Sequence, residues 1–306
     1  MAAKVWVVGA GKGGVGKTFF TSSLGITLSK LGFRVLLIDF DLAGANIHTS
    51  LGMPLNENNL SLYLEGKTNL NKLAQGTKIP RLSYIQGVWN EWMAHDLLKK
   101  DCKQLIEDAR RLNYDFVLID LGPGASSCHI DMFRNADEKI LVTTPEPTSI
   151  EKTYRFIEAL MCHELRESST KEAYDFLLKN MKRYRSAEKT EHFSFRKYLS
   201  SHPGFSFDYF ESFKQTPVRL AINCSRSRQD QDLGFSIKSV CTKYYDFPVD
   251  FIGSIDFDNA VWQSIRNREP VLIEKPFTPL AGQYLTIAKM LSTPTEVLTN
   301  LYRTAV

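Results

Sequence analysis

Residues 11–18 read GKGGVGKT, and this arrangement of glycine, lysine and threonine can bind phosphate groups. It fits G-x-x-x-x-G-K-[ST], the loop that holds a nucleoside triphosphate. In such a loop the backbone N–H groups of Gly13 to Thr18, together with the positive end of the following helix, surround the phosphate oxygens. Lys17 reaches the β- and γ-phosphates, and the Thr18 hydroxyl ligates Mg²⁺. The segment therefore predicts a site for a nucleoside triphosphate with Mg²⁺.

The same segment also fits a second phosphate-binding pattern. Gly9, Gly11 and Gly14 have the spacing G-x-G-x-x-G, which is typical of a dinucleotide-binding turn. Such a turn needs an acidic residue roughly 20 positions further along the chain for the ribose, and Asp39 is near enough to serve. This interpretation gives no role to Lys17 and the threonine after it. The triphosphate site is therefore the better prediction.

Three carboxylates follow apolar runs that we interpret as strands. The stretch RVLLIDFD contains Asp39 and Asp41 at its end, and the stretch FVLID ends in Asp120. A single apolar run with a terminal Asp more often marks a helix cap or a turn. Ligands of open α/β sheets, however, bind at the carboxyl ends of the strands, so these three side chains can converge on a metal ion and the γ-phosphate. Together with a complete phosphate loop they predict one site.

Short apolar runs alternate with helical patterns along the chain. This alternation predicts a doubly wound, mostly parallel sheet with helices on both faces, the fold of P-loop NTPases. Most of the runs are continuous, as expected for strands that are buried on both faces. The expected strands are 4–9, 34–39, 82–88, 115–120, 139–144, 218–223 and 249–255, and the expected helices are 17–31, 96–111, 150–165 and 279–291.

Residues 163–216 interrupt this alternation, because they contain no convincing strand. They hold eleven aromatic residues, a density that argues against a disordered linker. We expect a mostly helical insertion within a single domain that spans residues 1–306. Cations of the insertion such as Arg196 and Lys197, beside Tyr198, could form a stacking surface for DNA, although acidic residues in the same segment dilute the charge.

The composition is that of a globular protein with ordinary apolar and charged fractions, and its net charge of +4 does not by itself predict a nucleic-acid partner. No stretch approaches the ~18 consecutive apolar residues of a membrane span, and the N-terminus has no signal-peptide pattern. We expect a cytoplasmic protein, with contact to a membrane or the nucleoid left open. The cysteines form no C-x-x-C pair, which favours reduced thiols over disulfides or a zinc site. They are Cys102, Cys128, Cys162, Cys224 and Cys241.

These motifs resemble those of the MinD/ParA family of deviant Walker ATPases. The phosphate loop carries the second lysine of that family, Lys12, and the resemblance covers nearly the whole chain apart from the insertion. PEPTSI and the Gly-Pro-Gly stretch look closest to the FlhG/FleN-like regulators of flagellar number. The segments that carry the resemblance are GKGGVGKT (11–18), DFDLAGAN (39–46), IDLGPG (119–124), PEPTSI (145–150), LAINCSR (220–226) and NREPVL (267–272).

The resemblance implies separate roles for the two lysines and the carboxylates in ATP hydrolysis. Lys12 would cross to the phosphates of a partner subunit in an ATP-sandwich dimer, as an arginine finger does. Asp41 would orient the attacking water with help from Asn46, while Asp39 and Asp120 would support the Mg²⁺ from behind its direct ligands. The implied catalytic residues are Lys12, Lys17 and Asp41, and the implied metal residues are Thr18, Asp39 and Asp120.

The resemblance also implies where ATP or ADP is held. Asn223 would read the adenine, since its amide can pair with both a donor and an acceptor of the base. Asp256 would contact the nucleotide from the loop after the last strand. The implied nucleotide-binding residues are Gly11, Gly13, Gly14, Val15, Gly16, Lys17, Thr18, Phe19, Asn46, Asn223 and Asp256.

The implied function is that of a slow ATPase that dimerises with ATP and positions or counts a cellular structure, such as a flagellum or a division site, with an activating protein partner. A ParA-type partition ATPase that binds DNA non-specifically and a nucleotide-dependent scaffold or carrier are the alternatives. Relatives with an iron–sulfur cluster have a cysteine where this chain has Pro123, so we expect no cluster. The tail 293–306 has one cation, Arg303, which is few for a membrane-binding helix.

Overall fold

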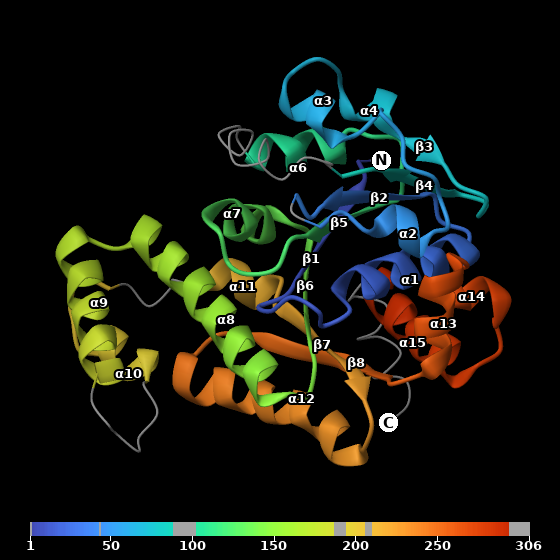
Figure 1. The fold of residues 1–306 in the computed structure, drawn as a ribbon. Helices are drawn as coiled ribbons and strands as arrows, with labels where there is room; N and C mark the ends of the chain where they lie inside the picture. The colour runs from blue at the N-terminus through green and yellow to red at the C-terminus, as the bar shows by residue number, and fades with distance from the viewer. Residues whose placement is uncertain (1, 43, 88–101, 187–193, 206–209, 294–306) are drawn as a thin grey trace, which may run out of the picture.

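A computed structural model describes residues 2–42, 44–87, 102–186, 194–205 and 210–293 (Figure 1). The predicted strand end at Val88, the first part of the predicted helix 96–111 and most of the tail lie outside these ranges. Among the described residues, no helix has both the length and the apolar character to cross a bilayer.

The described strands form one sheet of eight strands in the order β3-β4-β2-β5-β1-β6-β7-β8. All neighbours run parallel except β3, which pairs antiparallel with β4 at one edge. At the other edge, β8 carries a bulge at Ile252, since Phe251 pairs with Leu220 and Gly253 with Ala221. The strands are β1 (Lys4–Gly9), β2 (Val35–Phe40), β3 (Gln75–Gly76), β4 (Leu82–Ile85), β5 (Phe116–Leu121), β6 (Glu138–Thr143), β7 (Val218–Ser225) and β8 (Val249–Asp256).

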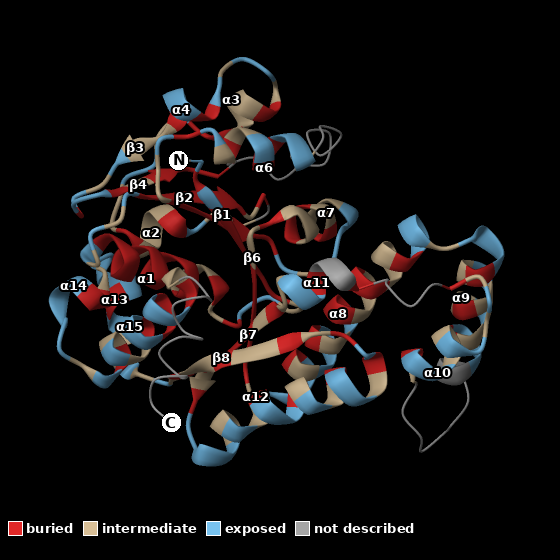
Figure 2. Ribbon diagram, turned by 180° about the vertical axis from the view of Figure 1, so that it is seen from behind, coloured by how far each residue is buried: buried red, intermediate tan, exposed pale blue. Residues whose placement is uncertain are grey.

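Helices cover both faces of the sheet, with their buried sides turned toward it (Figures 1 and 2). One face carries α1 (Lys17–Lys30) and α15 (Pro279–Ser292), and the other carries α6 (Cys102–Arg110), α7 (Ser127–Asn135) and α8 (Pro147–Ser168). The other helices within the described residues are α2 (Ile47–Ser50), α3 (Leu60–Leu64), α4 (Leu70–Leu73), α9 (Lys171–Ser186), α10 (Phe195–Ser200), α11 (Glu211–Gln215), α12 (Arg228–Val240), α13 (Asn259–Asn267) and α14 (Val271–Glu274), and a π-helical turn, η1 (Cys241–Tyr245), follows α12.

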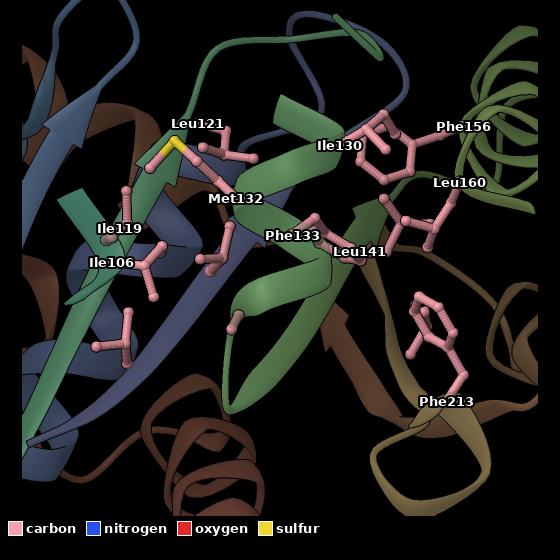
Figure 3. Packing of buried hydrophobic residues seen from close by; sticks show 14 of the residues in the cluster. Ile106, Ile119, Leu121, Ile130, Met132, Phe133, Leu141, Phe156, Leu160 and Phe213 are labelled. Carbon is pink, nitrogen blue, oxygen red and sulfur yellow. The ribbon is translucent and has the colours of Figure 1, made fainter. Parts of the chain in front are cut away.

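The core consists of two apolar clusters, one on each face of the sheet. Along β1, Val5 and Val7 belong to the cluster under α6, α7 and α8, whereas Trp6 and Val8 belong to the cluster under α1 and α15. Figure 3 shows the first cluster, in which side chains from β5, β6, α6, α7 and α8 meet. The continuous apolar runs of the sequence therefore reflect strands that are buried on both sides.

The predicted fold class is confirmed, and the predicted strands match the observed ones to within about three residues at each described end. The prediction missed the edge strand β3, which has only two residues. It also started α8 too late, since Pro147 occupies the first turn, where its missing N–H costs nothing. It missed α7 and α12 as well, although Ser126 and Ser227 cap them.

The described parts of residues 163–216 contain the end of α8, then α9, α10 and α11, and no strand. Buried aromatic side chains join this segment to the elements after β7. Phe195 packs edge-on against Tyr245, with ring centroids 5.3 Å apart, and Phe213 packs against Phe247 at 4.9 Å. In Figure 1, α9 and α10 lie farthest from the sheet, beyond α8.

The expectation of reduced thiols throughout the chain is wrong for one pair. Cys102 and Cys128 form a disulfide between the first residue of α6 and the second of α7. The two helices pack side by side on one face of the sheet, which brings the Cα atoms to 5.8 Å. With 26 positions between the two cysteines, no local spacing could reveal the pair. The other three cysteines, Cys162, Cys224 and Cys241, form no disulfide.

Candidate functional site

The phosphate loop links β1 to α1 and is packed so tightly that two of its glycines tolerate no side chain. A Cβ on Gly11 would overlap the backbone of Lys152 in α8, and a Cβ on Gly16 would overlap the amide of Asn223. Gly16 also has a φ of 80°, in the left-handed region that favours glycine. As the N-cap of α1 it offers no side-chain acceptor, so the first N–H groups of the helix are open to an anion.

The carboxylate of Asp120, at the end of β5, makes one ion pair and two hydrogen bonds with side chains at the start of α1. Lys17 Nζ lies 2.9 Å from Asp120 Oδ2, and Thr18 Oγ1 donates to the same oxygen at 2.6 Å. Thr21 Oγ1 lies 2.7 Å from Asp120 Oδ1. Asp120 and Lys17 are buried, with 0% and 6% of their surface exposed, so this contact is largely shielded from water. The sequence analysis missed Thr21, although it lies four residues after Lys17 and so on the same face of α1.

Asp39 stands opposite Asp120 in the register of β2 and β5. Its Oδ1 accepts from the Asp41 N–H at 3.2 Å, and its Oδ2 accepts from the Ile47 N–H at 2.9 Å. Complete burial, and then the charge of Asp120, raise the pKa of Asp39 to about 7, against the opposing effect of Lys17 and the backbone donors. Two buried carboxylates beside one ammonium leave an excess of negative charge that a divalent cation would offset.

The donors at this edge suit Mg²⁺ only when phosphates complete the coordination. The hydroxyl of Thr18 and the carboxylates of Asp39 and Asp120 are hard oxygen donors, which Mg²⁺ prefers. Within the described ranges, no group of three or more His, Cys, Asp or Glu side chains could hold a metal ion alone. The residues therefore fit an ion that arrives with a nucleotide, as Mg²⁺ does in other ATP sites.

Asp41 and Asn46 belong to the loop that follows β2. The Asn46 amide donates to the Gly44 carbonyl, so this side chain braces its own loop. Asp41 lies against the loop after β5, since a Cβ built on Gly122 would stand 3.3 Å from Asp41 Oδ1. The structure thus brings Asp41 next to the segment that follows Asp120, as the sequence analysis expected from the shared edge of the sheet.

Lys12 turns away from its own phosphate loop. Its Nζ lies 3.0 Å from Glu146 Oε2 and 2.9 Å from Thr148 Oγ1, at the start of α8. Both charged side chains are partly exposed, so the pair contributes at most ~1 kcal/mol and can open readily. The sequence analysis did not anticipate this contact within one chain.

The remaining predicted nucleotide residues have different surroundings. Asn223 is buried beneath the phosphate loop, where its Nδ2 donates to the Val15 carbonyl at 2.8 Å. Phe19 packs edge-on against Tyr284 of α15, with ring centroids 6.2 Å apart, so its half-buried side chain contacts the core. A Cβ on Gly13 would stand 3.8 Å from the Pro123 ring of the loop after β5, in ordinary contact.

Asp256 lies at the end of β8, in a shallow depression of about 880 Å³ beside the end of β7. Its Oδ1 accepts from Gln231 Nε2 at 3.1 Å, and its N–H donates to Gln283 Oε1 at 3.0 Å. On the wall of the depression, the Arg226 guanidinium lies 3.8 Å from the ring centre of Phe257. Sequence reasoning missed the contact between Arg226 and Phe257, because it joins the loops that follow β7 and β8.

Comparisons with known proteins find similar sequences and similar folds. A family model, described as ParA: NUBPL iron-transfer P-loop NTPase, matches residues 1–198. A septum site-determining protein MinD of Chlorella vulgaris is 34% identical over 152 residues, which are 48% of this chain and 52% of that protein. The chain spans about half the length of the first curated relatives that it matches.

Solved structures with the same fold cover almost the whole chain. MinD of Pyrococcus horikoshii, complexed with Mg-ADP, superposes with a TM-score of 0.65 at 21% identity, over 95% of this chain and 96% of that one. MinD in the MinC:MinD complex of Aquifex aeolicus gives 0.59 at 22% identity, over 95% and 98%. At these identities the likeness shows the fold.

Proposed function

The chain belongs to the ParA/MinD family of P-loop NTPases, and from that premise we propose that it is a Mg²⁺-dependent ATPase that acts as a molecular switch. The observation that carries the proposal is the buried contact of Lys17 and Thr18 with Asp120 at the open N-terminus of α1. An ammonium, a hydroxyl and a carboxylate at a helix N-terminus are the groups that a triphosphate with Mg²⁺ needs. The Mg-ADP of the Pyrococcus horikoshii structure supports this choice of ligand.

Each residue of the site has a proposed task in hydrolysis. Lys17 would exchange Asp120 for the β- and γ-phosphates, and Asp41, beside Gly122, would orient the attacking water. Mg²⁺ would offset the phosphate charge, held by Thr18 with Asp39 and Asp120 behind it. Asn223 would support the loop through Val15 as well as read the base.

Lys12 would complete the site of a second copy of this chain. We infer an ATP-bound dimer in which Lys12 leaves Glu146 and Thr148 and contacts the phosphates across the interface. The weak, partly exposed contacts of Lys12 support such an exchange, because little free energy is lost when they open. After hydrolysis, ADP has no γ-phosphate for Lys12 of the second copy to contact, so the dimer would dissociate to monomers.

The cellular output would be the placement of a structure in the cell. The names of the curated relatives favour a division site, whereas the flagellar alternative rests on PEPTSI and the Gly-Pro-Gly stretch. The MinC:MinD complex of Aquifex aeolicus supports a protein partner that reads or activates the dimer. We propose that residues 163–216 belong to the same domain and that the protein works in the cytoplasm. Contact with DNA through the exposed Arg196 and Lys197, or contact with a membrane, is the subsidiary alternative.

The test is the solution mass of the Asp41→Ala variant by light scattering, with Mg-ATP and then with Mg-ADP. Loss of the water-orienting carboxylate should trap ATP, so the mass should double with Mg-ATP alone. Adding Lys12→Ala should abolish the ATP dimer or its residual hydrolysis. Lys78→Ala removes an exposed lysine between β3 and β4 and should leave the ATP dimer unchanged.

Two outcomes would contradict the switch. A monomer with Mg-ATP, although ATP binding is measured directly, would show that the nucleotide does not set the oligomeric state. A dimer without nucleotide would instead favour the constitutive scaffold.

A further inference from the structure

His129 lies in the first turn of α7, directly after the disulfide-bonded Cys128, and its ring turns back over the loop 122–124. Its Nδ1 lies 3.1 Å from the carbonyl oxygen of Gly124. The N–H of Gly124 donates to the carbonyl of Ala10, at 2.9 Å, just before the phosphate loop. Gly124 is therefore bonded through its N–H to Ala10, at the start of the phosphate loop, and through its carbonyl to His129 of α7.

The other edge of the His129 ring faces the same place as Asp41. A Cβ built on Gly122 would stand 3.3 Å from His129 Cε1, 3.6 Å from His129 Nε2 and 3.3 Å from Asp41 Oδ1. A Cβ at Gly122 would therefore be in tight contact with both the imidazole and the carboxylate, and each would have to shift by a few tenths of an ångström.

The carbonyl of Gly124 fixes the protonation pattern of the ring. A carbonyl only accepts, so Nδ1 carries the proton and donates it. Burial lowers the pKa of His129, and the charge of Lys17 lowers it further, against the opposing effects of the Gly124 bond and of Asp41. The lowered pKa favours the neutral ring, whose Nδ1–H is the donor to the Gly124 carbonyl.

We propose that His129 is a positioning residue of the ATPase site, which holds the loop 122–124 against Asp41 through its bond to Gly124. This inference rests on the proposed function, since Asp41 is there the residue that orients water. The loop follows Asp120 directly, so a shift of its backbone would move both the metal-supporting strand end and the neighbour of Asp41. A displacement on the order of 1 Å at such a position can lower a turnover rate strongly.

The test compares His129→Ala with His129→Asn in the full chain, with the Cys102–Cys128 disulfide verified by mass. The Asn amide can place a donor near the position of Nδ1 and so keep the bond to Gly124. We expect kcat to fall about tenfold in His129→Ala, the loss that corresponds to one such bond, and to stay within about threefold in His129→Asn. The affinity for Mg-ADP should change less than about twofold in both variants. His202→Ala, at a half-buried histidine of the insertion that also bonds backbone, is the matched control and should leave kcat unchanged.

A second readout does not depend on activity. Amide hydrogen exchange of residues 121–126 should accelerate in His129→Ala and remain slow in His129→Asn. Equal exchange and equal kcat in His129→Ala and the parent would overturn the proposal, and so would an Asn variant as impaired as the Ala variant. If the parent itself does not hydrolyse ATP, the proposed function fails, whereas the exchange comparison still decides whether His129 holds the loop.

Discussion

Replacing Thr21 by Val should reveal how strongly the first turns of α1 hold Asp120. Valine has nearly the shape of threonine, so the change removes the hydroxyl and leaves the packing. The Thr21 hydroxyl has one proton and two neighbouring acceptors, Asp120 Oδ1 at 2.7 Å and the Lys17 carbonyl at 3.0 Å. The carboxylate is the stronger acceptor and receives the proton.

The expected loss follows from the charge and the burial of this bond. A hydrogen bond to a charged group contributes about 1.5–3 kcal/mol, against about 1 kcal/mol for a bond between neutral groups. Thr21 is fully buried, so no water replaces the missing donor. We expect Thr21→Val to lower the free energy of unfolding by about 2 kcal/mol.

Thr27→Val is the matched control on the same helix. Thr27 is also buried, and its hydroxyl donates to the carbonyl of Ser23 at 2.8 Å, which already lies in the helical ladder. Its loss should cost about 1 kcal/mol or less. Urea unfolding of both variants gives the difference, and the affinity for Mg-ADP should fall only in Thr21→Val. Equal losses of stability in the two variants would refute the argument that Thr21 acts through Asp120.

Three further changes follow from the packing. Burial lowers the pKa of Lys139 from 10.5 to about 8, so the penalty for its charge is complete below about pH 8 and disappears above about pH 10.5. The stability of the parent should therefore rise over that interval, and Lys139→Met should remove this dependence, measured by urea unfolding at both ends. Gly25→Ala places a Cβ 2.6 Å from Leu37 Cδ2 and should lower the free energy of unfolding by about 2 kcal/mol. In α15, the Cβ of Gly282→Ala meets nothing within 4 Å, so this variant should raise the free energy of unfolding by about 0.5–1 kcal/mol. Equal shifts of the melting temperature in the two variants would contradict this difference in packing. Replacing both Cys102 and Cys128 by Ser should lower the free energy of unfolding by about 3 kcal/mol, because the disulfide closes a loop of 26 positions in the unfolded chain. An unchanged midpoint of urea unfolding would show that the disulfide does not constrain the unfolded chain.

The sequence predicted best where local patterns carry the information. The ends of β2 and β5 could be read from apolar runs that stop at Asp39 and Asp120, because parallel strands place their carboxyl ends together. The start of α7 also had a local signal in the cap at Ser126, but the short helix lacks a long periodic pattern.

The rest depended on contacts between distant segments. Thr21 acquires its partner only when β5 lies beside β1, and His129 only when α7 folds back over the loop after β5. Glu146 meets Lys12 across 134 positions of the chain. These contacts arise from tertiary packing, which single-sequence periodicity does not encode.

The two edges of the sheet end in different ways. One edge is closed by β3, whose two antiparallel residues are too few to recruit another strand, and the other is bent by the bulge at Ile252 in β8. Short and bulged edges are poor templates for further hydrogen bonding, and proteins use both against edge-to-edge aggregation. The edges formed by the described strands β3 and β8 are therefore poor sites for a strand of a neighbouring molecule. In the proposed dimer, the contact would then be made by the loops at the strand ends, where binding can depend on the nucleotide that those loops hold.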